Sequence, residues 1–95
     1  MRVISKRALR EFWTKHRNAA APLTAWHNTI RGVSCAHPAE LKTVFSSADF
    51  VGDLTVFDIG GNKFRLITFI DYRSQIVYVK HVLTHGQYDE GRWKQ

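Results

Sequence analysis

The stretch that decides the fold runs from Leu54 to Leu83 and reads LTVFDIGGNKFRLITFIDYRSQIVYVKHVL. Three runs rich in β-branched and aromatic residues are separated by two turn sequences, Gly60-Gly61-Asn62 and Asp71-Tyr72-Arg73-Ser74. Glycine and asparagine accept the positive φ angles that hairpin turns require. The pattern therefore predicts an antiparallel meander with strands over 54–59, 63–71 and 75–83. On the third strand, alternation places Val77, Val79 and Leu83 on one face.

Helical patterns precede this meander. After a short candidate strand over 2–4, Ser5 is the predicted N-cap of a first helix. Pro22 suits the first turn of a second helix that ends at Gly32, and Pro38 begins a short third helix. The helical side chains predicted to face the core include Trp13, Trp26, Leu41, Val44 and Phe45. The interpretation is one α+β domain over 1–95, with two to three N-terminal helices packed on a small antiparallel sheet.

The chain is strongly basic, with a net charge of +6 and a pI near 9.9. Residues 1–31 hold seven Lys or Arg and a single acid, Glu11. A basic surface of this kind favours a polyanion or an acidic partner, although a merely solvated basic face is the alternative. No apolar run approaches the ~20 residues of a membrane span, and no signal peptide is predicted. Cys35 is alone, which favours a reducing compartment and predicts a cytoplasmic protein.

Metal and cofactor sites are not predicted. The five histidines are spread along the chain without the spacing that places ligands on one face. No glycine-rich nucleotide-binding loop is found in the sequence.

A cationic pair follows the first turn of the meander. Phe64, Leu66 and Ile70 are predicted to face the core, so Lys63 and Arg65 should project together from the opposite, solvent face. A guanidinium beside an ammonium makes a good clamp for a phosphate. A cross-strand salt bridge from Arg65 to Asp58 is the alternative.

Titratable side chains follow the last strand, in the segment Thr84-His85-Gly86-Gln87-Tyr88-Asp89. His85 can accept or donate a proton near neutral pH. Tyr88 lies on the same side of the segment as His85 if the segment is helical. A plain surface histidine is the alternative for His85, and His81 is interpreted as a core or edge residue. Further phosphate contacts with RNA are predicted for Arg73, Lys80, Arg92 and Lys94.

The combination of a basic helical hairpin, GGNKFRL over 60–66 and THxxYD over 84–89 resembles the HigB-type toxins of bacterial toxin–antitoxin systems, which are similar to RelE-like toxins. The opening residues 1–9 and the stretch 47–52 also resemble that family. The resemblance implies a RelE-like α+β fold and a metal-free endoribonuclease that cuts mRNA, commonly on the translating ribosome. It also implies a helix-turn-helix antitoxin, HigA, and an operon repressed through that antitoxin. Carried over by position, the catalytic residues are Arg65, His85, Tyr88 and Lys63.

Two other function classes stay open on the sequence. One is a non-catalytic module that binds RNA or the ribosome through the same basic face. The other is a protein-interaction subunit whose basic helices receive an acidic partner.

Overall fold

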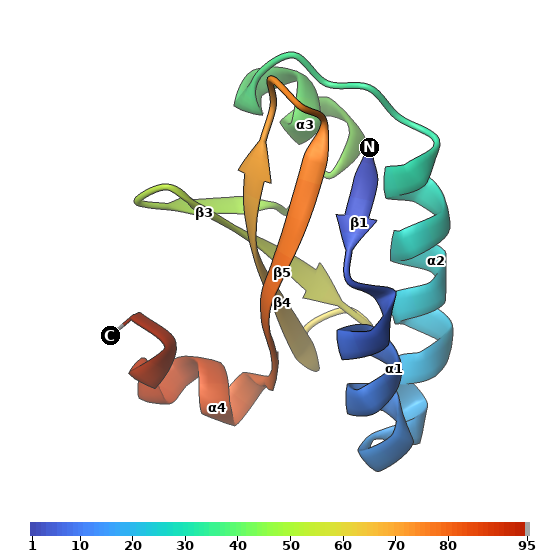
Figure 1. The fold of residues 1–95 in the computed structure, drawn as a ribbon. Coiled ribbons are helices and arrows are strands. Elements are labelled where there is room, and N and C mark those ends of the chain that lie inside the picture. Colours follow the sequence, from blue (N-terminus) through green and yellow to red (C-terminus); the bar gives the residue numbers. More distant parts are fainter. Residues whose placement is uncertain (95) are drawn as a thin grey trace.

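A computed structural model describes residues 1–94 of the chain (Figure 1). The strands are β1 (Arg2–Ile4), β2 (Asp49–Val51), β3 (Leu54–Ile59), β4 (Phe64–Asp71) and β5 (Ile76–Thr84). The helices are α1 (Lys6–Lys15), α2 (Ala20–Arg31), α3 (Pro38–Val44) and α4 (His85–Glu90), with two short 3-10 turns, η1 (Arg17–Ala19) and η2 (Arg92–Lys94).

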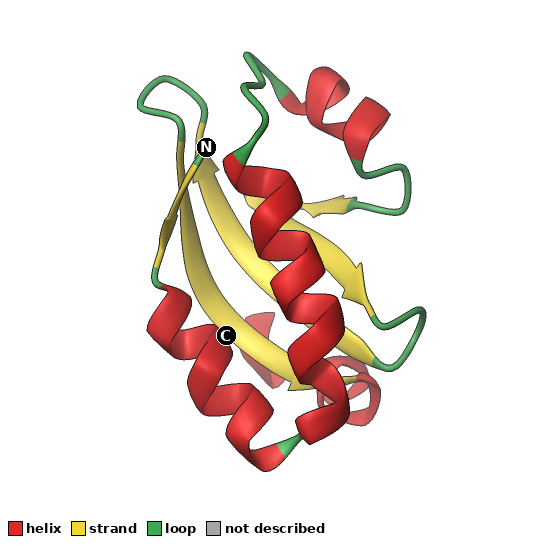
Figure 2. Cartoon of the chain, turned by 90° about the vertical axis from the view of Figure 1, so that its right-hand side faces the viewer, coloured by secondary structure: helices red, strands yellow, loops and turns green. Residues whose placement is uncertain are grey.

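One five-stranded sheet organises the domain, in the order β1-β5-β4-β3-β2. Strands β2 to β5 form the antiparallel meander, which confirms the predicted α+β class, and β1 adds to its end parallel to β5. Figure 2 shows α1 and α2 lying across one face of this sheet. The parallel pairing of β1 with β5 joins the two ends of the chain order, because α1 to α3 and strands β2 to β4 all lie between these two strands in the sequence. Strand β2, which is three residues long, was not among the predicted strands.

The main core lies between α1, α2 and the sheet. Leu23, Trp26 and Ile30 recur at helical spacing on α2 and are buried, as predicted for Trp26. Trp13 is only half-buried, although it packs against this core. The expectation for Val44 was wrong: the last residue of α3 is 43% exposed, because the short helix buries Leu41 alone.

Helix boundaries follow the predicted breaks with small shifts. Ser5 occupies the N-cap position of α1, but its side chain makes no capping hydrogen bond. The second helix begins at Ala20, so Pro22 lies in its first turn, and Gly32 ends it. None of the helices among residues 1–94 is long and apolar enough to cross a membrane.

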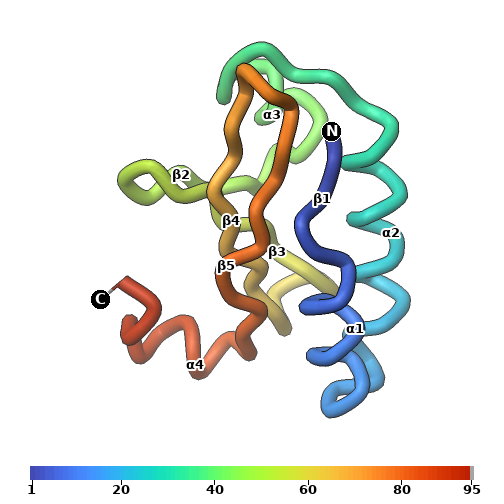
Figure 3. Tube along the Cα trace, in the orientation of Figure 1, coloured from blue at the N-terminus to red at the C-terminus, as the bar shows by residue number. Residues whose placement is uncertain are grey.

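A second, smaller core lies on the other face of the sheet. Val56, Ile67 and Trp93 are buried there, because α4 and η2 fold back over β3 and β4. The tube in Figure 3 shows α4 leaving β5 on the side away from α1 and α2. This second layer was not predicted, and it decides the environment of the candidate site.

A bulge in β5 changes which side chains face each core. Ile67 pairs with His81 and Thr68 pairs with Val79, so Lys80 is an extra residue in the strand. Beyond the bulge the alternation is reversed, and Val82 packs against the main core while Leu83 packs against the second. The prediction that Leu83 shares a face with Val77 and Val79 was therefore wrong. His81, interpreted as a core or edge residue, is exposed on the part of β5 that β1 does not pair, which is the edge alternative.

Candidate active site

The hairpin between β3 and β4 places Arg65 at the centre of the candidate site. Gly60 and Gly61 adopt φ angles of 64° and 70°, which the tight turn requires and which favour glycine. The turn sets Arg65 directly opposite Asp58 on the neighbouring strand. As predicted, Phe64 and Leu66 are buried in the main core, so the side chain of Arg65 lies on the other face.

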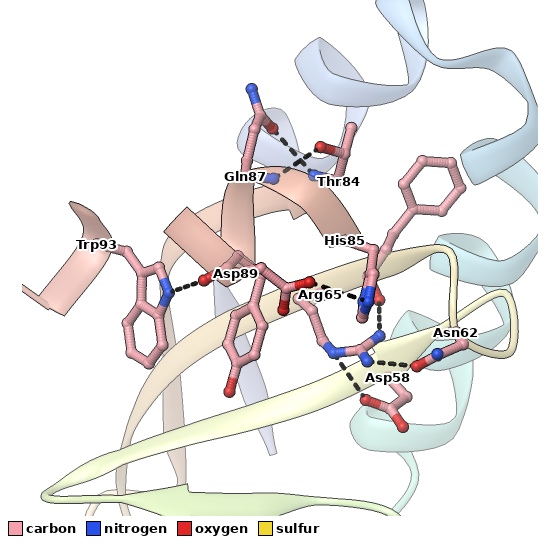
Figure 4. Close-up of polar contacts among 10 residues, drawn as sticks. Asp58, Asn62, Arg65, Thr84, His85, Gln87, Asp89 and Trp93 are labelled. Carbon is pink, nitrogen blue, oxygen red and sulfur yellow. Dashed lines mark hydrogen bonds and ion pairs between the residues drawn. The ribbon is translucent and has the colours of Figure 1, made fainter. Parts of the chain in front are cut away.

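Arg65 is nevertheless buried, with only 8% of the residue exposed. The expectation of a solvent-facing arginine was wrong, because α4 and η2 cover that face of the sheet. Its Nε lies 3.2 Å from Oδ1 of Asp58, so the cross-strand salt bridge weighed as the alternative is present. Nη1 donates to the backbone carbonyl of Phe64 at 3.1 Å, and Nη2 donates to the side-chain oxygen of Asn62 (Figure 4).

These contacts fix the position of the guanidinium and leave some of its N–H donors unused. A guanidinium has five N–H donors, and the three contacts use three of them. The ring of Tyr88 lies against the guanidinium, with its centroid 5.4 Å from Cζ of Arg65. A buried, fixed cation with remaining donors is a preorganised partner for a developing negative charge.

Helix α4 brings His85 to the same place. Thr84 and Gln87 form a capping box: Oγ1 of Thr84 accepts from the Gln87 amide at 3.2 Å, and the Gln87 side chain accepts from the Thr84 amide at 3.0 Å. The box fixes the first residue of the helix, His85. The amide of His85 donates to the carbonyl of Lys63 at 3.0 Å, which ties α4 to the hairpin that carries Arg65.

The imidazole of His85 has a carboxylate partner. Its Nε2 lies 3.1 Å from Oδ2 of Asp89, one helical turn further on, and Figure 4 shows the pair above Arg65. The side chain of His85 is 45% exposed, so an incoming ligand can reach it. A carboxylate that holds one ring nitrogen orients the imidazole for proton transfer.

Tyr88 is half-buried beneath the same helix. Its ring stacks on that of Trp93 at 5.0 Å, and the indole nitrogen of Trp93 donates to the Tyr88 carbonyl at 2.9 Å. Burial raises the pKa of the Tyr88 hydroxyl above its ordinary value; the carboxylate of Asp49 adds to the shift and Arg65 opposes it. The hydroxyl therefore stays protonated at neutral pH and can donate a hydrogen bond.

The other predicted cations lie at different distances from this centre. Lys63 is exposed in the turn, and none of the ion pairs found among residues 1–94 involves it. Arg92 and Lys94 flank the buried Trp93, where Arg92 pairs with Glu90 at 3.7 Å. Lys80 occupies the bulge of β5. Arg73 lies in the turn after β4, at the far end of the strand from Arg65, and is not brought to the centre.

Three side chains of the site escaped the sequence reasoning in their present roles. They are Asn62, Asp89 and Trp93. Asp89 was detectable, because residues four apart on a helix are neighbours and Asp89 follows His85 by four. The contact of Asn62 with Arg65 depends on the turn geometry, and that of Trp93 depends on how α4 folds back.

Histidines elsewhere serve other purposes. His16 stacks on Phe12 at 4.4 Å, His27 is a buried residue of α2, and His37 lies 3.5 Å from Glu40. Among residues 1–94, no group of three or more His, Cys, Asp or Glu is arranged to hold a metal ion.

Comparison with known proteins assigns the family. The family model of the HigB toxin, described as the RelE-like toxic component of a toxin–antitoxin system, matches residues 19–91. The mRNA interferase HigB of Escherichia coli O6:H1 is 31% identical over 93 residues, which cover 95% of this chain and 90% of that protein. The mRNA interferase toxin HigB of Escherichia coli K12 is 34% identical over 92 residues, covering 94% and 88%. The mRNA interferase HigB of Shigella flexneri shows the same values.

The family match includes Lys63, Arg65, His85 and Tyr88, whereas Arg92 and Lys94 lie outside it. The relatives extend over almost all of the chain, including β1 and α1, which precede the matched range. The chain therefore belongs to the HigB family of RelE-like toxins of toxin–antitoxin systems.

Proposed function

We propose that this chain is a metal-independent endoribonuclease that cleaves mRNA in the cytoplasm, on the translating ribosome. The observation that carries the proposal is the bond from the His85 amide to the carbonyl of Lys63. It joins the proton-transfer group on α4 to the cations of the β3–β4 hairpin. The names of the relatives, mRNA interferases, support the same reaction class.

Phosphate binding falls to Arg65 and Lys63. RNA supplies its own nucleophile, the ribose 2′-OH, whose oxygen attacks the phosphorus while the bond to the 5′-oxygen breaks. Negative charge accumulates on the nonbridging oxygens of the pentavalent phosphorane. Arg65 offers its remaining N–H donors from a fixed position, and Lys63 adds an ammonium from the exposed turn. Both charges come from the protein, so the mechanism requires no metal ion.

Proton transfer falls to His85. One proton must leave the 2′-OH and one must reach the departing 5′-oxygen, and the products are a 2′,3′-cyclic phosphate and a free 5′-hydroxyl. His85 is assigned one of these transfers, with Asp89 orienting its ring. Tyr88, which remains protonated, aligns the phosphate or assists as a hydrogen-bond donor.

Ribosomal RNA and decoding geometry would position the substrate, which reduces the positioning that the protein itself must supply. The proposed antagonist is a HigA-type helix-turn-helix antitoxin. Operator DNA would be bound only through that antitoxin. The basic surface of the N-terminal helices is suited to an acidic partner.

The test is induced expression in bacteria with mapping of RNA 5′ ends. We expect growth arrest and new 5′ ends within translated mRNA for the wild-type chain, and neither for His85→Ala at the same protein level. Co-expression of the HigA-type antitoxin should restore growth. A His85→Ala chain that still arrests growth without new ends would instead support the non-catalytic RNA- or ribosome-binding module. Normal growth with intact transcripts for the wild type would favour the protein-interaction subunit.

A further inference from the structure

Two aromatic side chains on the sheet belong to neither core. Phe69 on β4 and Tyr78 on β5 are cross-strand partners, with ring centroids 6.3 Å apart and ring planes 34° apart. Both are partly exposed, and neither packs with the buried clusters found among residues 1–94. A pair of adjacent rings that contributes to no core is available to a ligand.

The pair lies on the same face of the sheet as the candidate site. Strand β4 alternates regularly, because the extra residue of the bulge belongs to β5. Arg65, Ile67 and Phe69 therefore share one face. Helix α4 and η2 cover Arg65 and Ile67, whereas Phe69 lies beyond this second core. At ~3.3 Å per residue, the rings lie about 13 Å along the strand from Arg65.

Positive charge accompanies the rings. Nζ of Lys80 lies 5.9 Å from the centroid of the Tyr78 ring, and the bulge is what places this exposed lysine there. Arg73 is exposed in the turn beyond the pair. Of two nearby acids, Asp71 is already engaged, because its Oδ1 accepts from the amides of Arg73 and Ser74 at 3.1 and 3.2 Å. The other, Asp53, is exposed before β3 and lines a pocket with Phe69.

We propose that Phe69 and Tyr78 form a stacking platform for a base of single-stranded RNA, with Lys80 holding the adjacent phosphate. This inference rests on the proposed function, and it extends the substrate path from Arg65 along the β4–β5 ribbon toward Arg73. Exposed aromatic rings on a sheet, flanked by cations, are the means by which proteins bind unpaired bases without strict sequence preference. The platform also gives a place to two cations, Lys80 and Arg73, that lie away from the reacting centre.

The probe is a fluorescein-labelled, fully 2′-O-methylated RNA decamer, which lacks the nucleophile and cannot be cleaved. Binding to the full chain is measured by fluorescence anisotropy. Phe69→Leu and Tyr78→Leu should each weaken binding about tenfold, which corresponds to 1.4 kcal/mol and lies within the range for one stacked base. Tyr78→Phe keeps the ring and should bind within twofold of the wild type.

Phe50→Leu is the matched control. Phe50 is 43% exposed on the edge strand β2, and its register places it on the opposite face of the sheet from Phe69. Both residues line one pocket at this edge of the sheet, so Phe50→Leu tests whether a ring there matters outside the platform. This substitution should leave binding unchanged. Thermal melts verify that each variant folds. A 2-aminopurine base in the decamer gives a second measurement that needs no variant. Its fluorescence should fall when the wild-type chain binds, because stacking on an aromatic ring quenches it.

Wild-type affinity in both leucine variants, or no quenching on the wild-type chain, would overturn the platform. Leucine variants that no longer bind the antitoxin but still bind the decamer would also overturn the platform. That result would assign this face of the sheet to binding a protein. Failure of the proposed function is separable. If the rings bind the decamer but the wild-type chain does not cleave mRNA on programmed ribosomes, the nuclease is refuted and the platform is kept. If the wild-type chain cleaves that mRNA and the leucine variants cleave it equally well, the platform is refuted and the nuclease is kept.

Discussion

Arg65 and Asp58 face each other across β3 and β4, and Nε of the arginine lies 3.2 Å from Oδ1 of the aspartate. The side chain of Arg65 is 10% exposed and that of Asp58 is 33% exposed, so the pair lies at the boundary of the second core. This salt bridge has two consequences. It holds two strands together at the turn, and it keeps the guanidinium fixed beneath α4 for a phosphate.

Replacement of Arg65 by alanine should therefore reduce both activity and stability. Loss of one fixed donor to the phosphorane should lower the single-turnover rate by about a hundredfold. Removing one partner of a mostly buried pair should also cost about 1–3 kcal/mol of unfolding free energy. Arg65→Lys should restore stability better than activity, because an ammonium replaces the charge but not the planar array of donors. Urea unfolding alongside cleavage assays checks both, and full activity in Arg65→Ala would remove Arg65 from the mechanism.

Asp89 is expected to act through His85. Asp89→Asn keeps the size of the side chain but loses the charge that orients the imidazole 3.1 Å away. We expect the maximal cleavage rate to fall about tenfold while the concentration of RNA at half-saturation stays unchanged. Stability should change by less than about 1 kcal/mol, because the pair is exposed. Glu90→Gln, one residue further on, is the matched control and should cleave normally.

Tyr88 is expected to act as a protonated donor. Burial raises its pKa, so the hydroxyl keeps its proton up to at least the ordinary value of about 10. The ratio of wild-type to Tyr88→Phe cleavage rates should therefore be constant from about pH 6 to pH 9. A ratio that rises with pH within this range would show that the hydroxyl works in its ionised form and would contradict its role as a protonated donor. The same shift predicts a loss of folding stability above about pH 10, since the unfolded chain then releases this proton first.

Trp93 should matter for the site without touching the substrate. It is 7% exposed, packs with Val56 and Ile67, and stacks on Tyr88. Trp93→Ala should cost about 3 kcal/mol of unfolding free energy and free α4 from the sheet. Trp93→Phe keeps most of the stacking area and should retain most of the stability. Chemical denaturation of the two variants measures the difference, and an unchanged midpoint for Trp93→Ala would contradict the second core.

The sequence predicted what depends on local pattern. The meander followed from three apolar runs and two turn sequences, and β3 begins and ends where predicted. The bulge at Lys80 could not be predicted from the sequence, because an extra residue in a strand leaves the strand-like composition unchanged. The bulge nevertheless reverses the alternation from which the face of Leu83 was predicted. The parallel strand β1 depends on contacts across the whole chain, which no local pattern contains.

Within the candidate site, the sequence proposed a set of side chains but not their surroundings. Lys63, Arg65, His85 and Tyr88 do gather around one hairpin and one helix start. The burial of Arg65 could not be foreseen from alternation, because alternation divides a strand into two faces without saying what covers each one. Only the return of η2 over β4, anchored by Trp93, turns the second face from solvent into a core.

The central claim is that His85 on α4 transfers a proton in RNA cleavage beside the cations of the β3–β4 hairpin. Its most direct test is the single-turnover rate of mRNA cleavage on ribosomes programmed with one message, for wild type and His85→Ala at equal melting temperature. The account predicts a loss of about a hundredfold or more for His85→Ala, with a 2′,3′-cyclic phosphate on the wild-type product. A rate for His85→Ala within threefold of the wild type would contradict it.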